Sequence, residues 1–326
     1  MSTSAVLERS KEKKQSRVTV GTDPEFFLRN NKTGKFTSAI GIVKGTKDNP
    51  EKMPNGSLLQ YDNVAIEFAT EPAPDIEDFL EKIRNSFLDM YDKIPSNLDI
   101  VAEPSVNFEL DELMCEEAMK FGCDPDFNAW SLSQNEPPNT DGLTLRSCGG
   151  HLHVGHVDGD GCEFLHDIFG KINAVKIMDT FHGIVSVVLD SGDAAHERRQ
   201  LYGKAGCYRP TDYGVEYRVL SNFWLKSPDY VRLMDSLCQD ALNYMKKHSY
   251  DFLTDLDSEF DIVKEIQDDV GENGIVNVIN NSEVDKAKYI IDKYLATHFS
   301  EKTIDLLHTV MQDDDNTTIK KAWRLK

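Results

Sequence analysis

The sequence lacks several short motifs that usually identify a cofactor site or a class of enzyme. Its six cysteines, at positions 115, 123, 148, 162, 207 and 238, form no Cys-x-x-Cys pair, so a zinc clip or a dithiol redox centre is not expected. We interpret them as reduced thiols of an intracellular protein. There is also no Walker-type glycine loop followed by Lys-Ser or Lys-Thr, and no Gly-x-Ser-x-Gly elbow. P-loop NTPases and α/β-hydrolases are therefore disfavoured.

Basic residues are scarce relative to acidic ones. The chain has 36 lysines and arginines against 56 aspartates and glutamates, a net charge of -20, which opposes binding to nucleic acid or to an anionic membrane. Residues 1–17 contain no apolar stretch of the kind found in secretory signals, and no apolar run reaches the roughly 18 residues that span a bilayer. We expect a disordered tail over 1–17 and a cytoplasmic protein whose fold begins at residue 18.

Hydrophobic residues make up 40% of the 326 positions, which is enough for a substantial buried core. Alternating apolar positions predict strands over 18–28, 63–69, 98–108, 147–157 and 215–223. Apolar positions at helical spacing predict helices over 76–93, 163–189 and 227–248, followed by an acidic, mostly helical region from residue 252. Residues 122–145 are rich in Asn, Pro, Ser and Asp and predict a long surface loop of the kind that covers active sites.

Four of the predicted strands carry ionisable residues on the face opposite their apolar residues. Side chains two positions apart on a strand point to the same side of a sheet. The residues concerned are Asp23 and Glu25, Glu67, His151 and His153, and Glu216 and Arg218. A strand face turned to solvent would explain Glu67 or Glu216 alone. The indication of a functional site therefore comes from the occurrence of such residues on four strands.

Glycines bracket His151 and His153 in the predicted strand over 147–157. The stretch reads Cys148-Gly149-Gly150-His151-Leu152-His153-Val154-Gly155. Small residues at these positions would let a ligand or another backbone segment approach the imidazoles closely. We therefore interpret this motif as functional. His156 falls out of phase with the pair, and we expect it to be an ordinary surface histidine.

A cation would be needed if the polar faces of these strands converged. Carboxylates at close range cannot all remain ionised unless a positive charge offsets them. Carboxylate oxygens with one or two imidazoles suit Mg²⁺ or Mn²⁺ better than a metal that prefers thiolates. Two such ions bridging the phosphates of a nucleotide would support in-line phosphoryl transfer.

Cations are concentrated in one stretch of this acidic chain. Residues 196–209 contain Arg198, Arg199, Lys204 and Arg209 together with two glycines. A phosphate or a substrate carboxylate is a natural partner, since arginine binds such groups through two hydrogen bonds at once. A solvated basic loop that pairs with surface acids is the other interpretation.

The order of these motifs resembles the glutamine synthetase-like carboxylate-amine ligases. Within them the chain is most similar to the phage-encoded COOH-NH2 ligases of type 2. The resemblance rests on Gly21-Thr22-Asp23-Pro24-Glu25-Phe26, on the Gly149–Gly155 motif, and on Gly214-Val215-Glu216-Tyr217-Arg218. It covers roughly residues 18–226, and no motif falls in the last hundred residues.

The resemblance implies a role for each matching residue. Asp23 and Glu25 would serve two metal sites, and Glu67 would serve the second of them, with Asp62 as a candidate partner. His151 would be a metal ligand, and His153 would contact the nucleotide. Glu216 would bind metal and Arg218 the transferred phosphate. Glutamine synthetase has a further arginine where this chain has Gly214-Val215, so Arg209 or Arg199 would substitute for it, with Lys204 as a further nucleotide contact.

The implied fold is α+β, with a curved antiparallel sheet of the glutamine synthetase catalytic-domain type and helices on its convex face. Residues 18–250 would form the catalytic domain and 251–326 a helical extension packed on it. The implied reaction uses ATP and Mg²⁺ or Mn²⁺ to form an amide from a small or peptide carboxylate and an amine, through an acyl phosphate. The sequence does not identify these substrates, and it is compatible with a homo-oligomer in the cytoplasm, that of the host if a phage encodes the chain.

Two other functions share some of these features. Cupin-type and amidohydrolase-type metalloenzymes use a His-x-His pair without ATP. A cupin needs a Glu a few residues after the second histidine, and 154–158 contains none. An amidohydrolase carries the pair on its first strand, whereas here it lies in mid-chain. The third possibility is a catalytically idle binding protein that keeps the fold.

Overall fold

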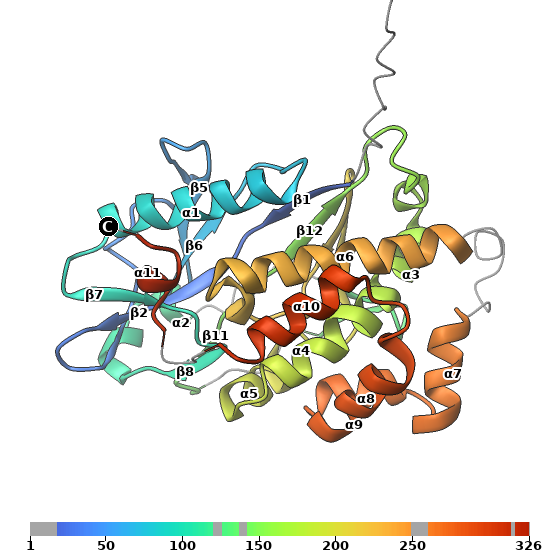
Figure 1. Cartoon of the computed structure of the whole chain (residues 1–326). Coiled ribbons are helices and arrows are strands. Elements are labelled where there is room, and N and C mark those ends of the chain that lie inside the picture. Colours follow the sequence, from blue (N-terminus) through green and yellow to red (C-terminus); the bar gives the residue numbers. More distant parts are fainter. Residues whose placement is uncertain (1–17, 120–125, 137–141, 249–259, 314–316, 326) are drawn as a thin grey trace, which may run out of the picture.

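The structure is a computed structural model, and it describes residues 18–119, 126–136, 142–248, 260–313 and 317–325. The expected disordered tail over 1–17 lies outside the described residues, as does part of the expected loop over 122–145. The described chain combines helices with antiparallel sheets (Figure 1), which confirms the α+β class.

Two six-stranded sheets form the strand layer, and the named strands within them pair antiparallel. In spatial order, the first sheet contains β1 (Thr19–Thr22), β12 (Leu152–Gly155), β14 (Gly214–Tyr217), β13 (Cys207–Thr211), β9 (Phe127–Asn128) and β10 (Ser133–Gln134). The second contains β3 (Phe36–Thr37), β2 (Glu25–Asn30), β6 (Ala65–Ala69), β5 (Leu58–Asp62) and β4 (Glu51–Lys52), with β7 (Leu98–Val101) also paired to β2. A separate ribbon joins β8 (Ser105–Asn107) to β11 (Leu145–Ser147).

The predicted single strand over 18–28 is wrong, because it is two strands in two sheets. β1 pairs with β12, whereas β2 pairs with β6 and β7. Pro24 separates them, and a proline has no backbone N–H to continue a ladder. The predicted strand over 98–108 is divided in the same way into β7 and β8. Asp23 and Glu25 therefore lie where the two sheets meet.

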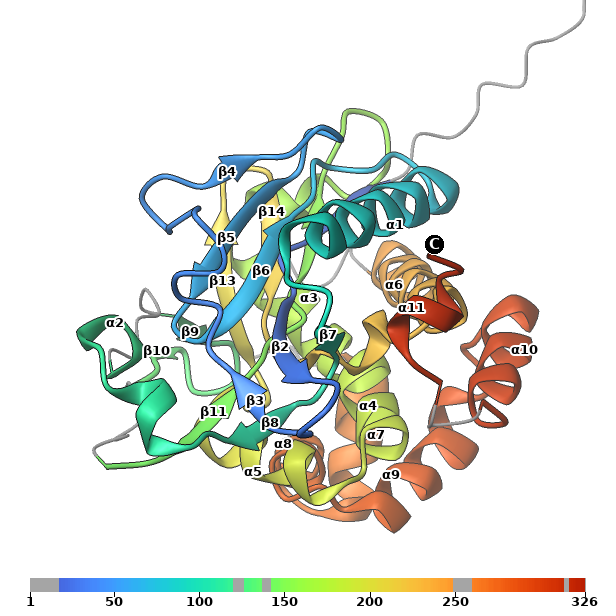
Figure 2. The ribbon, with the colours of Figure 1, turned by 90° about the vertical axis from the view of Figure 1, so that its left-hand side faces the viewer.

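Helix α1 (Ile76–Lys93) matches its predicted bounds. Asp75 caps it by accepting hydrogen bonds from the backbone N–H groups of residues 77 and 78. Its apolar stripe lies on the second sheet, where the ring of Phe87 is 5.2 Å from that of Phe26 and 5.6 Å from that of Phe68. Figure 2 shows α1 beside β6 and β5.

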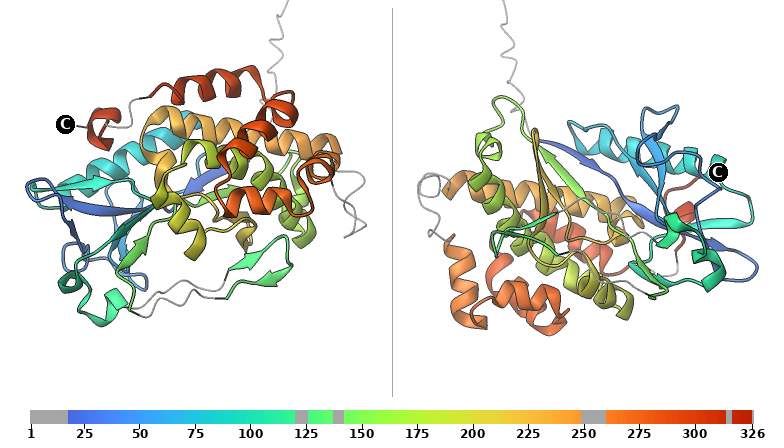
Figure 3. Two further views of the ribbon diagram at one scale, coloured as in Figure 1. Left: turned by 90° about the horizontal axis from the view of Figure 1, so that it is seen from below. Right: turned by 180° about the vertical axis from the view of Figure 1, so that it is seen from behind.

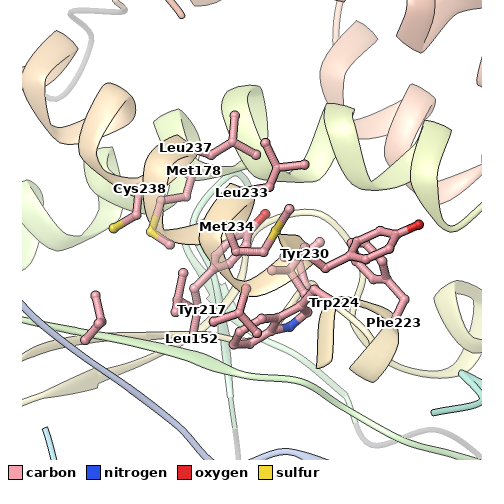
Figure 4. Packing of buried hydrophobic residues seen from close by; sticks show 14 of the residues in the cluster. Leu152, Met178, Tyr217, Phe223, Trp224, Tyr230, Leu233, Met234, Leu237 and Cys238 are labelled. Atoms are coloured by element: carbon pink, nitrogen blue, oxygen red, sulfur yellow. The ribbon is translucent and has the colours of Figure 1, made fainter. Parts of the chain in front are cut away.

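The other predicted helices cover the first sheet. Residues 168–189 form one continuous helical run of α3 (Ile168–Met178), a π-helical turn (Asp179–Gly183) and α4 (Ile184–Leu189), and α6 spans Pro228–His248. Figure 4 shows Leu233 and Met234 of α6 with Met178 of α3 packed over Leu152 and Tyr217 of the sheet. The run Ile168–Leu189 is long and apolar enough to cross a membrane, but 72% of its most apolar window is buried inside the protein, as in a core helix.

Two elements between these helices were not predicted. Helix α5 (Asp193–Leu201) has no apolar stripe, because much of its buried face consists of the arginines at 198 and 199. Strand β13 was missed for a similar reason, since it begins in the same cationic stretch. The predicted strand over 215–223 ends at Tyr217 and gives way to a 3-10 turn over Asn222–Leu225.

The C-terminal region adds helices to the helical side of the molecule. They are α7 (Asp261–Val270), α8 (Gly274–Asn280), α9 (Val284–Ile290), a π-helical turn (Ile291–Leu295), α10 (Glu301–Val310) and α11 (Ile319–Ala322). Figure 3 shows these orange and red helices together with α4 and α6. Near the C-terminus, Trp323 is buried and donates its indole N–H to the carbonyl of Leu225 at 2.9 Å.

Two short helices lie in the connection between β8 and β9. They are a 3-10 turn (Leu110–Leu113) and α2 (Glu116–Met119). A further 3-10 turn (Glu163–His166) precedes α3. Within the predicted surface loop over 122–145, the described residues 126–136 contain a hairpin that extends the first sheet, with Asn128 opposite Cys207.

Candidate active site

The first group of candidate ligands comprises Asp23, His151 and Glu216. One ligand atom from each lies within 4.8 Å of the others. Nδ1 of His151 is 3.0 Å from Oδ1 of Asp23 and 3.6 Å from Oε1 of Glu216. The residues come from the segment after β1, from the residue before β12, and from β14. These strands are neighbours in the first sheet, so the pairing of the strands brings the side chains together.

The second group comprises Glu25, Asp62 and Glu67, again with one oxygen from each within 4.8 Å. Glu25 on β2 lies directly opposite Glu67 on β6, and Gln60 on β5 lies on the other side of Glu67. The amide of Gln60 donates to Oε2 of Glu67 at 2.9 Å. Asp62 ends β5, so neighbouring strands of the second sheet supply all three carboxylates.

The segment Asp23-Pro24-Glu25 links the two groups, because Asp23 belongs to one and Glu25 to the other. Gly149, in the segment before β12, fixes this segment: its carbonyl accepts from the N–H of Glu25 at 2.9 Å, and its own N–H donates to Oε2 of Glu25 at 2.7 Å. A Cβ at Gly149 would lie 2.4 Å from Nε2 of His151. The glycine is thus required for the imidazole to lie against this backbone.

Burial, together with the charges of neighbouring carboxylates, raises the pKa values of Glu25, Glu67 and Glu216. Burial and the charge of Asp62 raise the pKa of Glu25 to about 8. Burial and the charges of Asp23 and Glu25 raise the pKa of Glu67 well above its ordinary value. Burial and Asp23 raise the pKa of Glu216 to about 7. A cation among these oxygens would favour their ionised forms.

The two histidines differ in their environments. Burial and the neighbouring Arg218 lower the pKa of His151 to about 3, so its ring is neutral at physiological pH. Burial alone would lower the pKa of His153, but Asp23 outweighs it and the pKa is raised. Burial would raise the pKa of Asp23, yet His153 and His151 hold it well below its usual range. A neutral imidazole beside an ionised carboxylate is a ready ligand set for a metal ion.

Two arginines adjoin the first group. Nη1 of Arg218 pairs with Oε1 of Glu216, and its Nε lies 3.5 Å from Oδ2 of Asp126. The guanidinium of Arg218 also lies over the ring of Tyr202, 5.3 Å from its centroid. Nη1 of Arg209 is 3.1 Å from Oε2 of Glu216. The site thus holds cationic groups next to the candidate metal ligands.

A cavity of about 330 Å³ opens beside both groups. Asp23, Glu25, Asp62, Glu67, His151, Arg209 and Arg218 lie on its wall. Apolar side chains, among them Phe27 and Val64, complete the lining. His153 and Glu216 are not part of this wall as described.

The structure does not bring Arg199 and Lys204 to the cavity, so their expected roles there receive no support. The side chain of Arg199 is 3% exposed, and its guanidinium donates to the carbonyls of Asp190 and Ser186 and to the hydroxyl of Ser282. It therefore stabilises the helical layer. Lys204 is exposed in the turn before β13. The expectation for His156 is also wrong: its side chain is 3% exposed, and Nδ1 is 2.8 Å from Oδ1 of Asp160.

Several residues at the site escaped prediction. Arg198 is buried and donates to the carbonyls of Cys148, Val219 and Leu220, each at 2.8 Å, so it holds the segment before His151 next to the segment after β14. Asp126 lies in the predicted loop over 122–145, which is rich in Asn and Asp, so nothing in the sequence distinguishes it from the other acidic residues there. Gln60 could have been found, since alternation on the strand before Glu67 places it two positions from Asp62.

Residues 143–256 of the chain match a family model of carboxylate-amine ligases. The model is described as Phage phiEco32-like COOH.NH2 ligase-type 2, and the matched segment is similar to it. The match confirms the resemblance inferred from the sequence for its two later motifs, at residues 149–155 and 214–218. The matched residues include His151, His153, Glu216 and Arg218. Comparison with curated proteins gives no match.

Two solved structures are similar to the chain in fold. One is a bifunctional glutathione synthetase from Pasteurella multocida, with 11% identity, a TM-score of 0.45, and coverage of 94% of this chain and 48% of that one. The other is a glutamate-cysteine ligase from Francisella tularensis in complex with AMP, with 11% identity, a TM-score of 0.49, and coverage of 94% and 84%. The chain thus spans about half the length of the glutathione synthetase. At these identities and scores, neither likeness carries an argument about activity.

Proposed function

We propose that this protein is an ATP-dependent ligase that joins a carboxylate to an amine through an acyl phosphate, with two divalent cations. The observation that carries the proposal is the pair of three-ligand groups that share the Asp23-Pro24-Glu25 segment and lie beside Arg209 and Arg218. In-line transfer of a phosphoryl group needs positive charge around the transferring oxygens and a fixed geometry.

The residues present fit Mg²⁺ or Mn²⁺. Asp23, His151 and Glu216 would hold one ion, and Glu25, Asp62 and Glu67 the other. The five carboxylates are hard donors and the neutral imidazole is a borderline one, and the raised pKa values of Glu25 and Glu216 indicate that the ionised carboxylates leave excess negative charge for a cation to balance. When bound, the ions would neutralise phosphate oxygens of the nucleotide.

The chain's own side chains would then act on the reacting groups. A carboxylate oxygen of the first substrate attacks the γ-phosphorus of ATP, and ADP leaves. The nitrogen of the second substrate attacks the acyl carbon of the acyl phosphate, phosphate leaves, and the nitrogen loses a proton. Arg218 and Arg209 would stabilise the transferring phosphoryl group, and His153 would contact the nucleotide.

Arg218 is well supported for this task. Its guanidinium is buried, and it is fixed by Glu216, by Asp126 and by the ring of Tyr202. A preorganised cation loses little conformational freedom when charge develops on the phosphoryl group. Asp126 belongs to the described part of the predicted cover, so the hairpin over 126–136 would both hold Arg218 and help to exclude water from the acyl phosphate.

The finer fold assignment and the domain limits belong to the same proposal. The sheet would be of the glutamine synthetase catalytic-domain type, with 18–250 as the catalytic domain and 251–326 as an extension. The buried core supports packing of the extension on the domain, because Ile262, Ile266 and Trp323 join the same hydrophobic cluster as the residues of α6. Burial of the apolar run Ile168–Leu189 is in keeping with a cytoplasmic enzyme.

A substrate screen tests the proposal. The purified chain is incubated with ATP, Mg²⁺ and pools of amino acids, short peptides and amines, with ADP release and products lighter by one water as readouts. We expect ADP only when an acid and an amine are both present, and hydroxylamine should replace the amine to give a hydroxamate. Metal-dependent hydrolysis of pool members without ADP would overturn the proposal in favour of a metallohydrolase.

A further inference from the structure

Tyr213 lies in the turn between β13 and β14, outside every motif described above. Its hydroxyl is 2.5 Å from Nδ1 of His153, while Nε2 of His153 is 2.9 Å from Oδ1 of Asp23. Three side chains thus form a hydrogen-bonded chain from the surface to the first group of ligands. Both nitrogens of His153 are engaged, which fixes the plane of the ring.

The backbone holds Tyr213 in this position. Its carbonyl accepts from the N–H of His156 at 2.8 Å, and the next residue, Gly214, pairs with Gly155 across the two strands. Gly214 has a φ of 154°, and a Cβ there would lie 2.1 Å from the carbonyl oxygen of Val154. Because residue 214 is a glycine, its backbone can approach the carbonyl of Val154 closely. The turn can then close so that Tyr213 lies beside His153.

This arrangement selects one tautomer of His153. The carboxylate oxygen of Asp23 accepts a hydrogen bond, so the proton it receives must lie on Nε2. In the neutral ring Nδ1 is then an acceptor, and the hydroxyl of Tyr213 is its donor. A cation held by Asp23 would compete for the same carboxylate oxygen, and the Nε2–H would become available to an anionic phosphate.

We propose that Tyr213 is the positioning residue that holds His153 with its proton on Nε2, directed at the nucleotide phosphates. This inference rests on the proposed function, because it takes His153 as the nucleotide contact. Tyr213 acts through His153: without the hydroxyl the ring would rotate or change tautomer, and the phosphates would lose a fixed donor.

The test removes one oxygen atom. Tyr213→Phe should weaken binding of Mg·AMPPNP, measured by titration calorimetry, by about 3- to 10-fold, as expected for one lost hydrogen bond. In a His153→Ala background the same substitution should change affinity by less than about 2-fold, because the coupled partner is gone. Tyr289→Phe is the matched control: Tyr289 is 43% exposed against 44% for Tyr213, and its hydroxyl bonds to Asp269, far from the motifs of the site.

Nitrogen-15 NMR of labelled histidine reads the tautomer directly. At a pH at which the ring is neutral, the free protein should show His153 with an acceptor Nδ1, and Tyr213→Phe should shift or broaden that signal while the other histidines stay unchanged. An equal loss of affinity in both backgrounds, or an unchanged His153 signal, would overturn the proposal. If the wild-type protein binds no Mg·AMPPNP, the proposed function fails, and the NMR spectrum still decides whether Tyr213 sets the tautomer.

Discussion

Substitution of Gly149 by alanine is the sharpest perturbation of the site. The added Cβ would lie 2.4 Å from Nε2 of His151 and 3.0 Å from its Cδ2. The imidazole would have to retreat by about 0.6 Å to reach a separation of even 3.0 Å, and it is buried, so little space is open to it. Displacement of a reacting group by about 1 Å costs on the order of 100-fold in rate.

We therefore expect Gly149→Ala to lower kcat by about 100-fold and to weaken Mn²⁺ binding by at least 10-fold, with a stability loss of about 1–3 kcal/mol from overpacking. Titration with Mn²⁺ followed by electron paramagnetic resonance, together with urea unfolding, measures both effects. Gly192→Ala is the matched control, because a Cβ at Gly192 meets no atom within 4 Å. The reasoning would be refuted if the two variants had similar activity and Mn²⁺ affinity.

Three further predictions follow from named contacts. Mg²⁺ or Mn²⁺ at a concentration of 100 times Kd should stabilise the folded wild type by about 2.7 kcal/mol and so raise its melting temperature. Glu67→Gln should halve that rise or abolish it, and an equal rise in both proteins would place the ion elsewhere. Burial raises the pKa of Asp179 from 3.8 to about 7, so the folded protein keeps a proton that the unfolded chain releases, and the free energy of unfolding should fall as pH rises from 4 to 7. Asp179→Asn should flatten this slope in urea titrations, and parallel curves would contradict the assignment. Arg218→Lys should lower kcat by about 100-fold or more, whereas Arg199→Lys should mainly lower the melting temperature; the reverse pattern would restore a phosphate role to Arg199.

Strand periodicity predicted which side chains could share a face, and apolar positions at helical spacing predicted α1 to its end residues. It could not predict that Asp23 and Glu25 divide between two sheets, because that depends on Pro24 and on which partner strand each half finds. The pattern of carboxylates and histidines still pointed to residues that the fold brings together, since i and i+2 positions remain close on either side of the break.

The arginines show where the sequence is insufficient. The sequence does not distinguish the four cations of the stretch 196–209, which are Arg198, Arg199, Lys204 and Arg209. Of these four, only Arg209 lies on the cavity wall. Helix α5 turns Arg198 and Arg199 into the interior, where backbone carbonyls satisfy them. Burial of an arginine depends on tertiary acceptors far along the chain, and no local periodicity records them.

Transfer of oxygen-18 tests the central claim most directly. A substrate acid found in the screen is labelled in its carboxylate, and the reaction is run with ATP, Mg²⁺ and the amine. An acyl phosphate intermediate requires that one labelled oxygen leave with the phosphate, so phosphorus NMR should show the isotope-shifted inorganic phosphate in step with amide formation. Amide formation with unlabelled phosphate would contradict the account.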